Sequence, residues 1–135
     1  MRDEQTADYT IVCLDVNNLK TVNDTCGHAK GDVLIRSAAS VIAQTFEQDG
    51  MVARTGGDEF VAVLRTTDEK RLSALMEQFE QNIAQKNLAE NRLNLSIAYG
   101  YASASQQDND IDKIYQTADD RMYEKKKQMK AAAQH

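Results

Sequence analysis

The chain has 135 residues, 41% of them hydrophobic and 27% charged, a composition typical of a single globular domain. Its apolar runs are too short to span a membrane, and the polar first residues exclude a secretory signal. The two cysteines lack metal-ligand spacing and indicate reduced thiols of a cytoplasmic protein. A net charge of −5 argues against a general nucleic-acid binder.

The first part of the chain predicts a strand followed by two helical segments. Residues 9–14 are apolar and rich in β-branched side chains, which indicates a buried strand that ends at Asp15. Residues 17–24 favour a short helix or turn. Apolar residues then recur every four positions over 32–50, which predicts a helix of about four turns.

A hairpin and three further elements follow. The runs 51–54 and 60–64 predict two antiparallel strands joined by a glycine-containing loop. Thr67 is expected to cap a long helix, and the strict alternation over 93–99 predicts another strand. Apolar residues spaced over 111–122 indicate a final helix. The predicted order is β-α-α-β-β-α-β-α.

The hairpin loop has the unusual sequence Gly56-Gly57-Asp58-Glu59-Phe60. A turn needs at most one or two glycines, so a glycine pair followed by two acids suggests a backbone that approaches a ligand closely. Asp58 and Asp15 both follow predicted strand ends, and Mg²⁺ usually takes one or two protein carboxylates together with phosphate oxygens. The alternative is a solvated turn with solubilising acids, and residue types alone leave both interpretations open.

Two further clusters carry polar residues. Residues 23–32 contain glycines but lack the spacing of a phosphate-binding P-loop. His28 is the only internal histidine, which excludes a multi-histidine metal site, and Asp32 taken alone suits the first turn of a helix. Arg121 and four lysines up to Lys130 make the last helix basic, which either stabilises the helix end or compensates the charge of a polyphosphate.

Together, these segments resemble the GGDEF domain family over nearly the whole chain. Residues 56–60 match the family's signature at every position. The other similar segments are 15–20, 22–24 and 27–32 (the DxDxFK…IND…GHxxGD block), 96–100 (the SIGxA strand) and 118–126 (the ADxALYxAK helix). The resemblance implies the palm fold of class III nucleotidyl cyclases, an α+β domain in βααββαβ order. Its mixed, mainly antiparallel five-stranded sheet is flanked by helices.

Members of this family are diguanylate cyclases, which condense two GTP into cyclic di-GMP and release two pyrophosphates. The resemblance therefore implies GTP as substrate, two Mg²⁺ ions per active site with Mn²⁺ as a substitute, and a second protomer, because catalysis needs a homodimer. Residues 1–135 would form a single domain that lacks the family's opening DxLTGLxNR segment. It would be the C-terminal part of a longer, cytoplasmic or membrane-anchored protein with an N-terminal sensor domain, itself contacting neither membrane nor nucleic acid.

The resemblance also assigns roles by position. Asp15, Asp58 and the carbonyl of Val16 correspond to metal ligands, and Asp58, Glu59 and Lys126 to catalytic residues. Asn23 and Asp32 match the pair that reads guanine, and Ile35 an apolar contact to the base. The implied substrate-binding residues are Asn18, Leu19, Lys20, Asn23, Asp32, Ile35, Gly57, Lys126 and Lys130.

Some positions depart from the family pattern. Asn17 replaces the usual second aspartate, and Glu47 and Gly50 stand where an RxxD product-binding site would begin and end, so we expect no product inhibition through that site. The alternative function is a catalytically inactive GGDEF module that binds GTP or a partner protein and acts as a regulatory domain; the intact residues 56–60 and Asp15 argue against it. An adenylyl-type cyclase is a third possibility, which Asp32 opposes.

Overall fold

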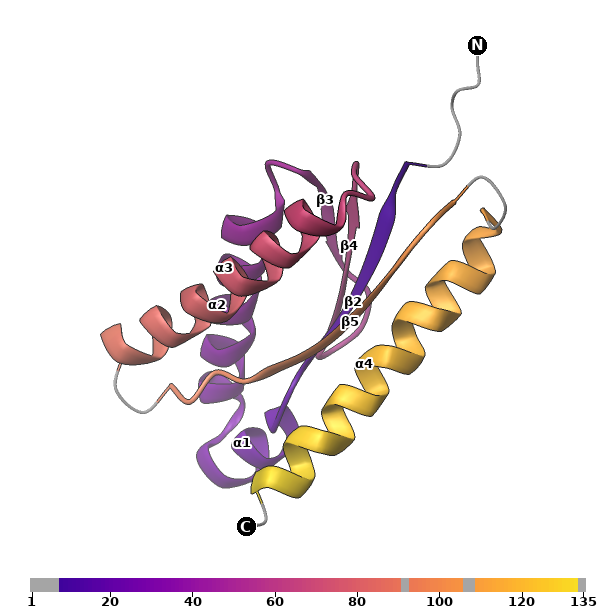
Figure 1. Cartoon of the computed structure of the whole chain (residues 1–135). Coiled ribbons are helices and arrows are strands. Elements are labelled where there is room, and N and C mark those ends of the chain that lie inside the picture. Colours follow the sequence, from indigo (N-terminus) through magenta and orange to yellow (C-terminus); the bar gives the residue numbers. More distant parts are fainter. Residues whose placement is uncertain (1–7, 91–92, 106–108, 134–135) are drawn as a thin grey trace.

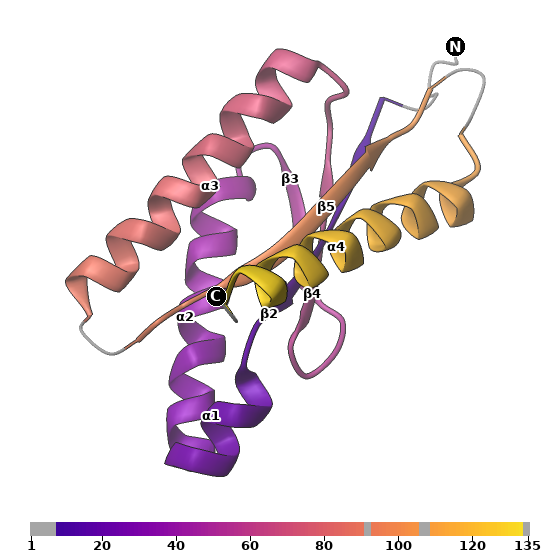
Figure 2. The same cartoon turned by 60° about the horizontal axis from the view of Figure 1, so that its bottom comes forward.

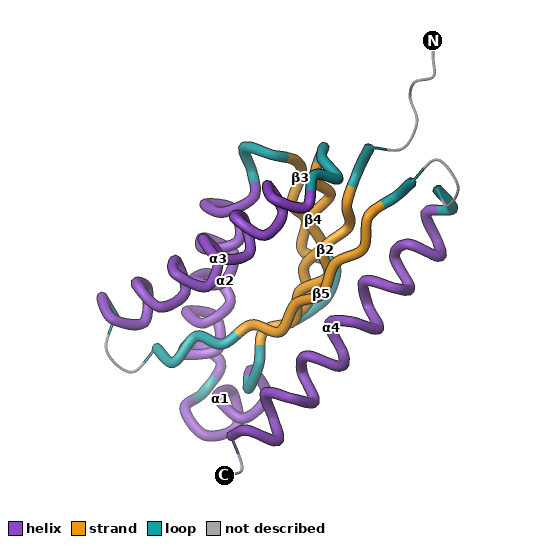
Figure 3. Tube along the Cα trace, in the orientation of Figure 1, coloured by secondary structure: helices purple, strands orange, loops and turns teal. Residues whose placement is uncertain are grey.

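The computed structural model describes residues 8–90, 93–105 and 109–133. Its elements follow the predicted order: β2 (Thr10–Val16), α1 (Leu19–Cys26), α2 (His28–Phe46), β3 (Gly50–Arg54), β4 (Glu59–Leu64), α3 (Glu69–Ala89), β5 (Ile97–Ser103) and α4 (Ile111–Ala133). The strands form one sheet in the order β3-β4-β2-β5, with α2 and α3 on one face and α4 on the other (Figures 1 and 3). None of the described helices combines the length and apolar character that a membrane span requires.

Strand β2 is the central element, because helices cover both of its faces and bury every residue in it. Its even-numbered residues face the main core under α2 and α3, where the Phe46 and Phe79 ring centroids lie 5.3 Å apart. Its odd-numbered residues, such as Cys13, face a smaller core under α4 that includes Ala118. This alternation follows from the period of two in a strand, and it places Asp15 on the α4 side.

The sheet differs from the prediction in strand number. Four strands, not five, make up the sheet in the described part of the chain, and all three pairings are antiparallel rather than mixed. The fifth strand came from the family resemblance alone. The periodicity of this sequence supports four strands, and these four are present.

Strand β5 lies four residues later than the predicted strand 93–99 at both of its ends. Asn94 has a left-handed backbone (φ 51°), which interrupts the extended conformation before Ile97. The side chain of Asn87 instead pairs with the backbone of Leu95, at 2.6 and 2.9 Å. At the other end, residues 100–103 continue the strand because they pair with β2. The missing Cβ of Gly100 leaves room for the backbone of α4.

Two helix starts also differ from the prediction. Helix α2 begins at His28, after Gly27 with φ 90°, so Asp32 is the fifth residue of the helix and lies beyond its first turn. Helix α3 is capped by Asp68 and not by Thr67, because the Asp68 carboxylate accepts a hydrogen bond from the Lys70 N–H. A carboxylate at this position also interacts favourably with the helix dipole.

Candidate active site

Three carboxylates meet at one end of the sheet. Asp15 lies near the end of β2, and Glu59 opposite it is the first residue of β4. Asp58 lies in the loop before Glu59, and the Val16 N–H donates to its carbonyl at 2.8 Å. One oxygen of each carboxylate lies within 4.8 Å of the others. Figure 2 shows this hairpin loop at the same end of the molecule as α1.

Asp15 is the buried member of this cluster, only 5% exposed. Its Oδ2 accepts a hydrogen bond from Lys126 Nζ at 2.8 Å, whereas its buried Oδ1 has no partner among the described residues. Burial raises the pKa of Asp15; the hydrogen bond from Lys126 opposes this shift, and the charge of Asp58 adds to it. The same hydrogen bond raises the pKa of Lys126, so the lysine is a cation.

The unpartnered Asp15 oxygen fits a metal ion. Buried polar atoms are nearly always paired, and a carboxylate oxygen without a partner raises the free energy of the folded protein. A cation placed among the three carboxylates would contact this oxygen and reduce the repulsion between the acids. Carboxylate oxygens are the ligands of hard divalent cations, so this cluster is suited to bind such a metal.

A pocket of about 320 Å³ adjoins the acidic cluster, and α4 forms one of its walls. It gathers many of the residues singled out in the sequence: Val16, Asn18, Leu19, Lys20, Asp58, Lys126 and Lys130. Lys20 and Lys130 are exposed, and Lys126 is half-buried. The pocket thus places three lysines beside Asp58 and the acidic cluster, a combination suited to a metal-bound phosphate ester.

The other predicted substrate-binding residues do not line this pocket. Asn23 of α1 lies against Gly31 of α2, where any Cβ would collide with the Asn23 side-chain oxygen. The exposed Asp32 follows directly, so these polar residues gather where α1 meets α2. Ile35 belongs to the main core and is 7% exposed. Its contact with a base stays a prediction, as do the roles of Asn23 and Asp32.

The two positions that correspond to the RxxD product-binding motif, Glu47 and Gly50, do not form a binding site for the product. Glu47 is exposed at the end of α2, and a Cβ at Gly50 would collide with the Val63 carbonyl. The neighbouring Asp49 pairs with Arg71 at 2.7 Å. A product site at these positions therefore lacks its arginine, and no side chain fits at Gly50.

Sequence reasoning missed several residues around the site. Asn17 Nδ2 donates to Ser96 Oγ at 2.9 Å and to Met129 Sδ at 3.6 Å, so it ties β2 to the segment before β5 and to α4. The departure of Asn17 from the family pattern was the one available signal. Arg54 donates to the carbonyls of Gly56 and Gly57. No sequence pattern predicted this contact, because an arginine at a strand end usually faces solvent.

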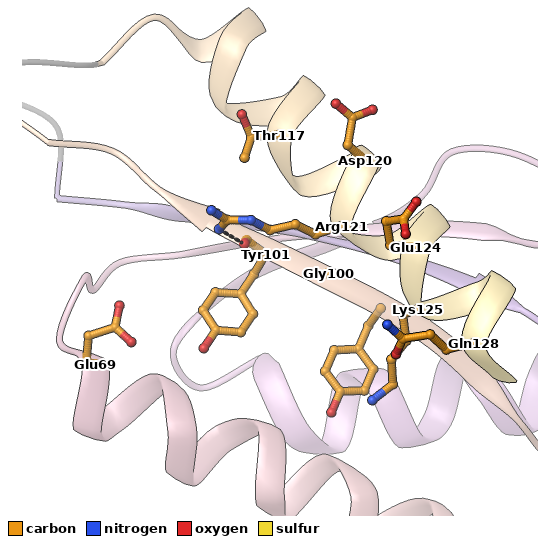
Figure 4. Close-up of a pocket in the computed structure, with 10 residues that line it drawn as sticks. Glu69, Gly100, Tyr101, Thr117, Asp120, Arg121, Glu124, Lys125 and Gln128 are labelled. Atoms are coloured by element: carbon orange, nitrogen blue, oxygen red, sulfur yellow. Dashed lines mark hydrogen bonds between the residues drawn. The ribbon is translucent and has the colours of Figure 1, made fainter.

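A second and larger cavity, about 640 Å³, lies on the other side of α4, along β5 (Figure 4). Two of its basic groups already have partners in the cavity wall: Arg121 donates to the Tyr101 carbonyl at 2.8 Å, and the Lys125 ammonium lies 5.1 Å from the Tyr99 ring centroid. The Tyr99 hydroxyl donates to Glu80 at 2.9 Å. Size therefore does not identify this cavity as the reactive site.

Comparisons with known proteins agree with this geometry. The family model described as "Diguanylate cyclase, GGDEF domain" matches residues 1–132. The chain is 30% identical over 126 residues to the probable diguanylate cyclase DgcT of Escherichia coli, covering 90% of this chain and 28% of that protein. It is 28% identical over 125 residues to diguanylate cyclase A of Treponema denticola, covering 91% and 34%.

A solved structure shows the same fold. The active GGEEF domain of a diguanylate cyclase from Vibrio cholerae superposes with a TM-score of 0.79 at 28% identity, over 93% of this chain and 80% of that one. The family match spans almost the full length and includes the acidic hairpin and both polar clusters. This chain therefore belongs to the GGDEF domain family of diguanylate cyclases.

Proposed function

We propose that this domain condenses two GTP molecules into cyclic di-GMP with release of two pyrophosphates. The observation that carries the proposal is the buried, unpartnered Oδ1 of Asp15, which lies beside Asp58 and Glu59 next to a pocket with lysine walls. The chain spans about a third of its curated relatives, 28% of one and 34% of another. The proposal therefore concerns the domain, and we propose that the full-length protein adds an N-terminal sensor.

The proposed cofactor is Mg²⁺, two ions per site, with Mn²⁺ as a substitute. Asp15, Asp58 and the Val16 carbonyl would hold it, with Glu59 as a neighbouring acid. Bound there, the metal would ease deprotonation of a 3′-hydroxyl and neutralise the leaving pyrophosphate. Lys126 already neutralises part of the acidic charge through Asp15.

The nucleotide would lie between the lysines and the α1–α2 junction. Lys20, Lys126 and Lys130 would contact the phosphates, and the pocket already brings these three together. Guanine offers an N1–H and an amino group on one edge, which a carboxylate such as Asp32 accepts and adenine lacks. A site built to bond specific groups rejects an analogue that lacks them, because its own polar atoms then stay unpaired.

Condensation requires two nucleotides, whereas the acidic cluster and the pocket beside it form a single site among the described residues. A second protomer would present its GTP head-to-head, so that each 3′-hydroxyl attacks the α-phosphate of the opposite nucleotide. The protein would then contribute mainly orientation and electrostatic stabilisation. We propose a homodimer as the active form.

The alternative is a module that binds GTP or a partner protein and regulates without catalysis. A module that only binds a partner protein has no need of a carboxylate buried with one oxygen unpaired, since such an atom lowers stability. Asp15 would be free to change to a neutral residue. The acidic cluster therefore favours a nucleotide site, and product formation distinguishes the cyclase from a module that only binds GTP.

Incubation with GTP and Mg²⁺, followed by mass spectrometry, tests the proposed function. The domain is fused to a dimeric coiled coil so that protomers meet. Cyclic di-GMP is expected from the parental domain, at a rate about 10²-fold or more above that of Asp58→Ala. ATP should give no cyclic product, and Asp32→Ser should admit it. GTP that binds without product formation would instead establish the regulatory alternative.

A further inference from the structure

The Gly56-Gly57 segment has no side chains to hold it, and Arg54 supplies the missing restraint. Arg54 is the last residue of β3. It donates from Nε to the Gly56 carbonyl at 3.0 Å and from Nη2 to the Gly57 carbonyl at 2.7 Å. A guanidinium is planar and its donors form a rigid fork, so two bonds to successive carbonyls fix the orientation of both peptide groups.

The orientation of these carbonyls decides where the neighbouring N–H groups point. In a trans peptide the C=O and the N–H point in opposite directions, and the described peptides are all trans. The Gly57 N–H shares a peptide with the Gly56 carbonyl, and the Asp58 N–H shares one with the Gly57 carbonyl. Both N–H groups therefore point away from Arg54.

Several other backbone groups of the loop are paired within the protein. The Glu59 carbonyl accepts from the N–H groups of Thr55 at 2.9 Å and Gly56 at 3.3 Å, and the Asp58 carbonyl accepts from Val16. Within the described part of the chain, no acceptor takes the N–H of Gly57 or of Asp58. Two successive backbone N–H groups without a protein acceptor can both donate to an anionic oxygen.

We propose that Arg54 is a positioning residue for the reaction. Its fork holds the two peptides so that the Gly57 and Asp58 N–H groups are preset for a phosphate oxygen, while the Asp58 carboxylate stays beside Asp15. The catalytic part of this role rests on the proposed function, whereas the restraint of the two peptide groups by Arg54 does not. A lysine at this position keeps the charge but lacks the rigid planar fork.

Backbone dynamics test the hold on the loop without any substrate. In the parental protein, we expect ¹⁵N order parameters near 0.85 at Gly57 and Asp58, falling below about 0.6 in both Arg54→Ala and Arg54→Lys. Arg65→Ala is the matched control, because this exposed arginine also donates to a loop carbonyl, that of Gln48, at the other end of the hairpin. Unchanged order parameters at Gly57 and Asp58 in the Arg54 variants would overturn the proposal.

Steady-state kinetics test the consequence for catalysis. Both Arg54 variants should lose about ten- to a hundredfold in kcat, the scale of a small misplacement of reacting groups. KM for GTP should change little, because the lysines of the pocket are intact, and added guanidinium should partly restore the Arg54→Ala variant. Near-parental turnover of Arg54→Lys would refute the positioning role, since the charge alone would then suffice.

These readouts separate the two proposals. If the loop loses order in both variants but the parental domain makes no cyclic di-GMP, the cyclase function fails while the hold by Arg54 stands. If the parental domain is active and the loop keeps its order without Arg54, only the inference about Arg54 fails. Circular dichroism of each variant verifies that the fold is retained.

Discussion

Helix α4 separates two cavities that differ in how their polar groups are satisfied. On one side, the smaller pocket adjoins Asp15, whose buried Oδ1 has no partner among the described residues. On the other side, the larger cavity forms a groove along β5. In this groove, Arg121 is hydrogen-bonded to the Tyr101 carbonyl, and Lys125 lies over the Tyr99 ring. The groove is twice as large, at about 640 against 320 Å³.

The difference shows that a buried polar atom without a hydrogen-bond partner identifies a binding site better than the volume of a cavity does. A buried polar atom without a partner lowers stability, so its presence points to a ligand that supplies the missing contact. Polar groups that already pair with one another gain little from a ligand, which would have to displace existing contacts. The smaller pocket therefore has the stronger chemical reason to bind a ligand.

We expect the largest effect on the rate of cyclic di-GMP synthesis, in a comparison of Asp15 with Asp120 on the other side of α4. Asp15→Asn keeps the shape of the side chain but removes the charge that a metal ion needs, so cyclic di-GMP synthesis should fall about 10²-fold or more. Asp120→Asn is the matched control, because this exposed acid lines the groove and accepts a hydrogen bond from Gln116. Its rate should stay within about twofold of parental, as is usual at exposed positions. Equal losses in the two variants would break the comparison.

Two glycines, Gly100 beside α4 and Gly57 in the hairpin loop, extend the comparison to the free energy of unfolding. A Cβ at Gly100 would collide with the backbone of Arg121 and Met122 in α4, and backbone atoms cannot swing aside. Gly100→Ala should therefore lower the free energy of unfolding by about 1–3 kcal/mol. A Cβ at Gly57 meets nothing within 4 Å, so Gly57→Ala should leave stability nearly unchanged. Urea denaturation measures both, and a Gly57 effect as large as that at Gly100 would contradict the expectation.

Two adjacent lysines give a pH-dependent version of the same test. Lys126→Met leaves the carboxylate of Asp15 without its hydrogen bond and should cost about 1–2 kcal/mol at pH 8, discounted for the partial exposure of the lysine. Burial raises the pKa of Asp15, and losing Lys126 raises it further. Protonated Asp15 has no charge to compensate, so the loss should shrink as the pH falls.

The control for this test is Lys125→Met, which removes a cation–π contact with Tyr99. This contact involves no buried carboxylate, so the effect should be below about 1 kcal/mol and independent of pH. Urea denaturation at pH 5 and pH 8 compares the two variants. A Lys126→Met effect that grows toward acid would have the wrong sign for a buried, raised-pKa carboxylate.

Much of this arrangement could be predicted from the sequence, because it rests on local patterns. The β-branched run before Asp15 and the four-residue repeat of α2 correctly predicted a strand and a helix. The alternation over 93–99 predicted the correct face but placed both ends of the strand four residues too early. Asn94 with positive φ and the side chain of Asn87 interrupt the strand, and neither effect appears in a hydrophobic pattern.

The missed parts of the site depend on contacts between distant segments. Asn17 meets Ser96 and Met129 only after β2, the segment before β5 and α4 have packed together. The unpaired Oδ1 of Asp15 also depends on burial under α4, which residue type does not reveal. Arg54 is close to its partners in sequence, but its contact depends on the loop conformation and not on a pattern of residue types.

The smallest expected effect compares two exposed arginines that both donate to backbone carbonyls. Arg121 donates to the Tyr101 carbonyl of the edge strand β5. The groove is open there, so water can replace this hydrogen bond. Arg121→Ala should therefore cost about 0.5 kcal/mol of stability and leave turnover within about twofold, whereas Arg54→Ala should lose at least about tenfold in kcat. Parallel assays of cyclic di-GMP formation and urea denaturation compare the two variants. A tenfold loss of turnover in Arg121→Ala would place the groove in the catalytic machinery, and the distinction between the two sides of α4 would no longer hold.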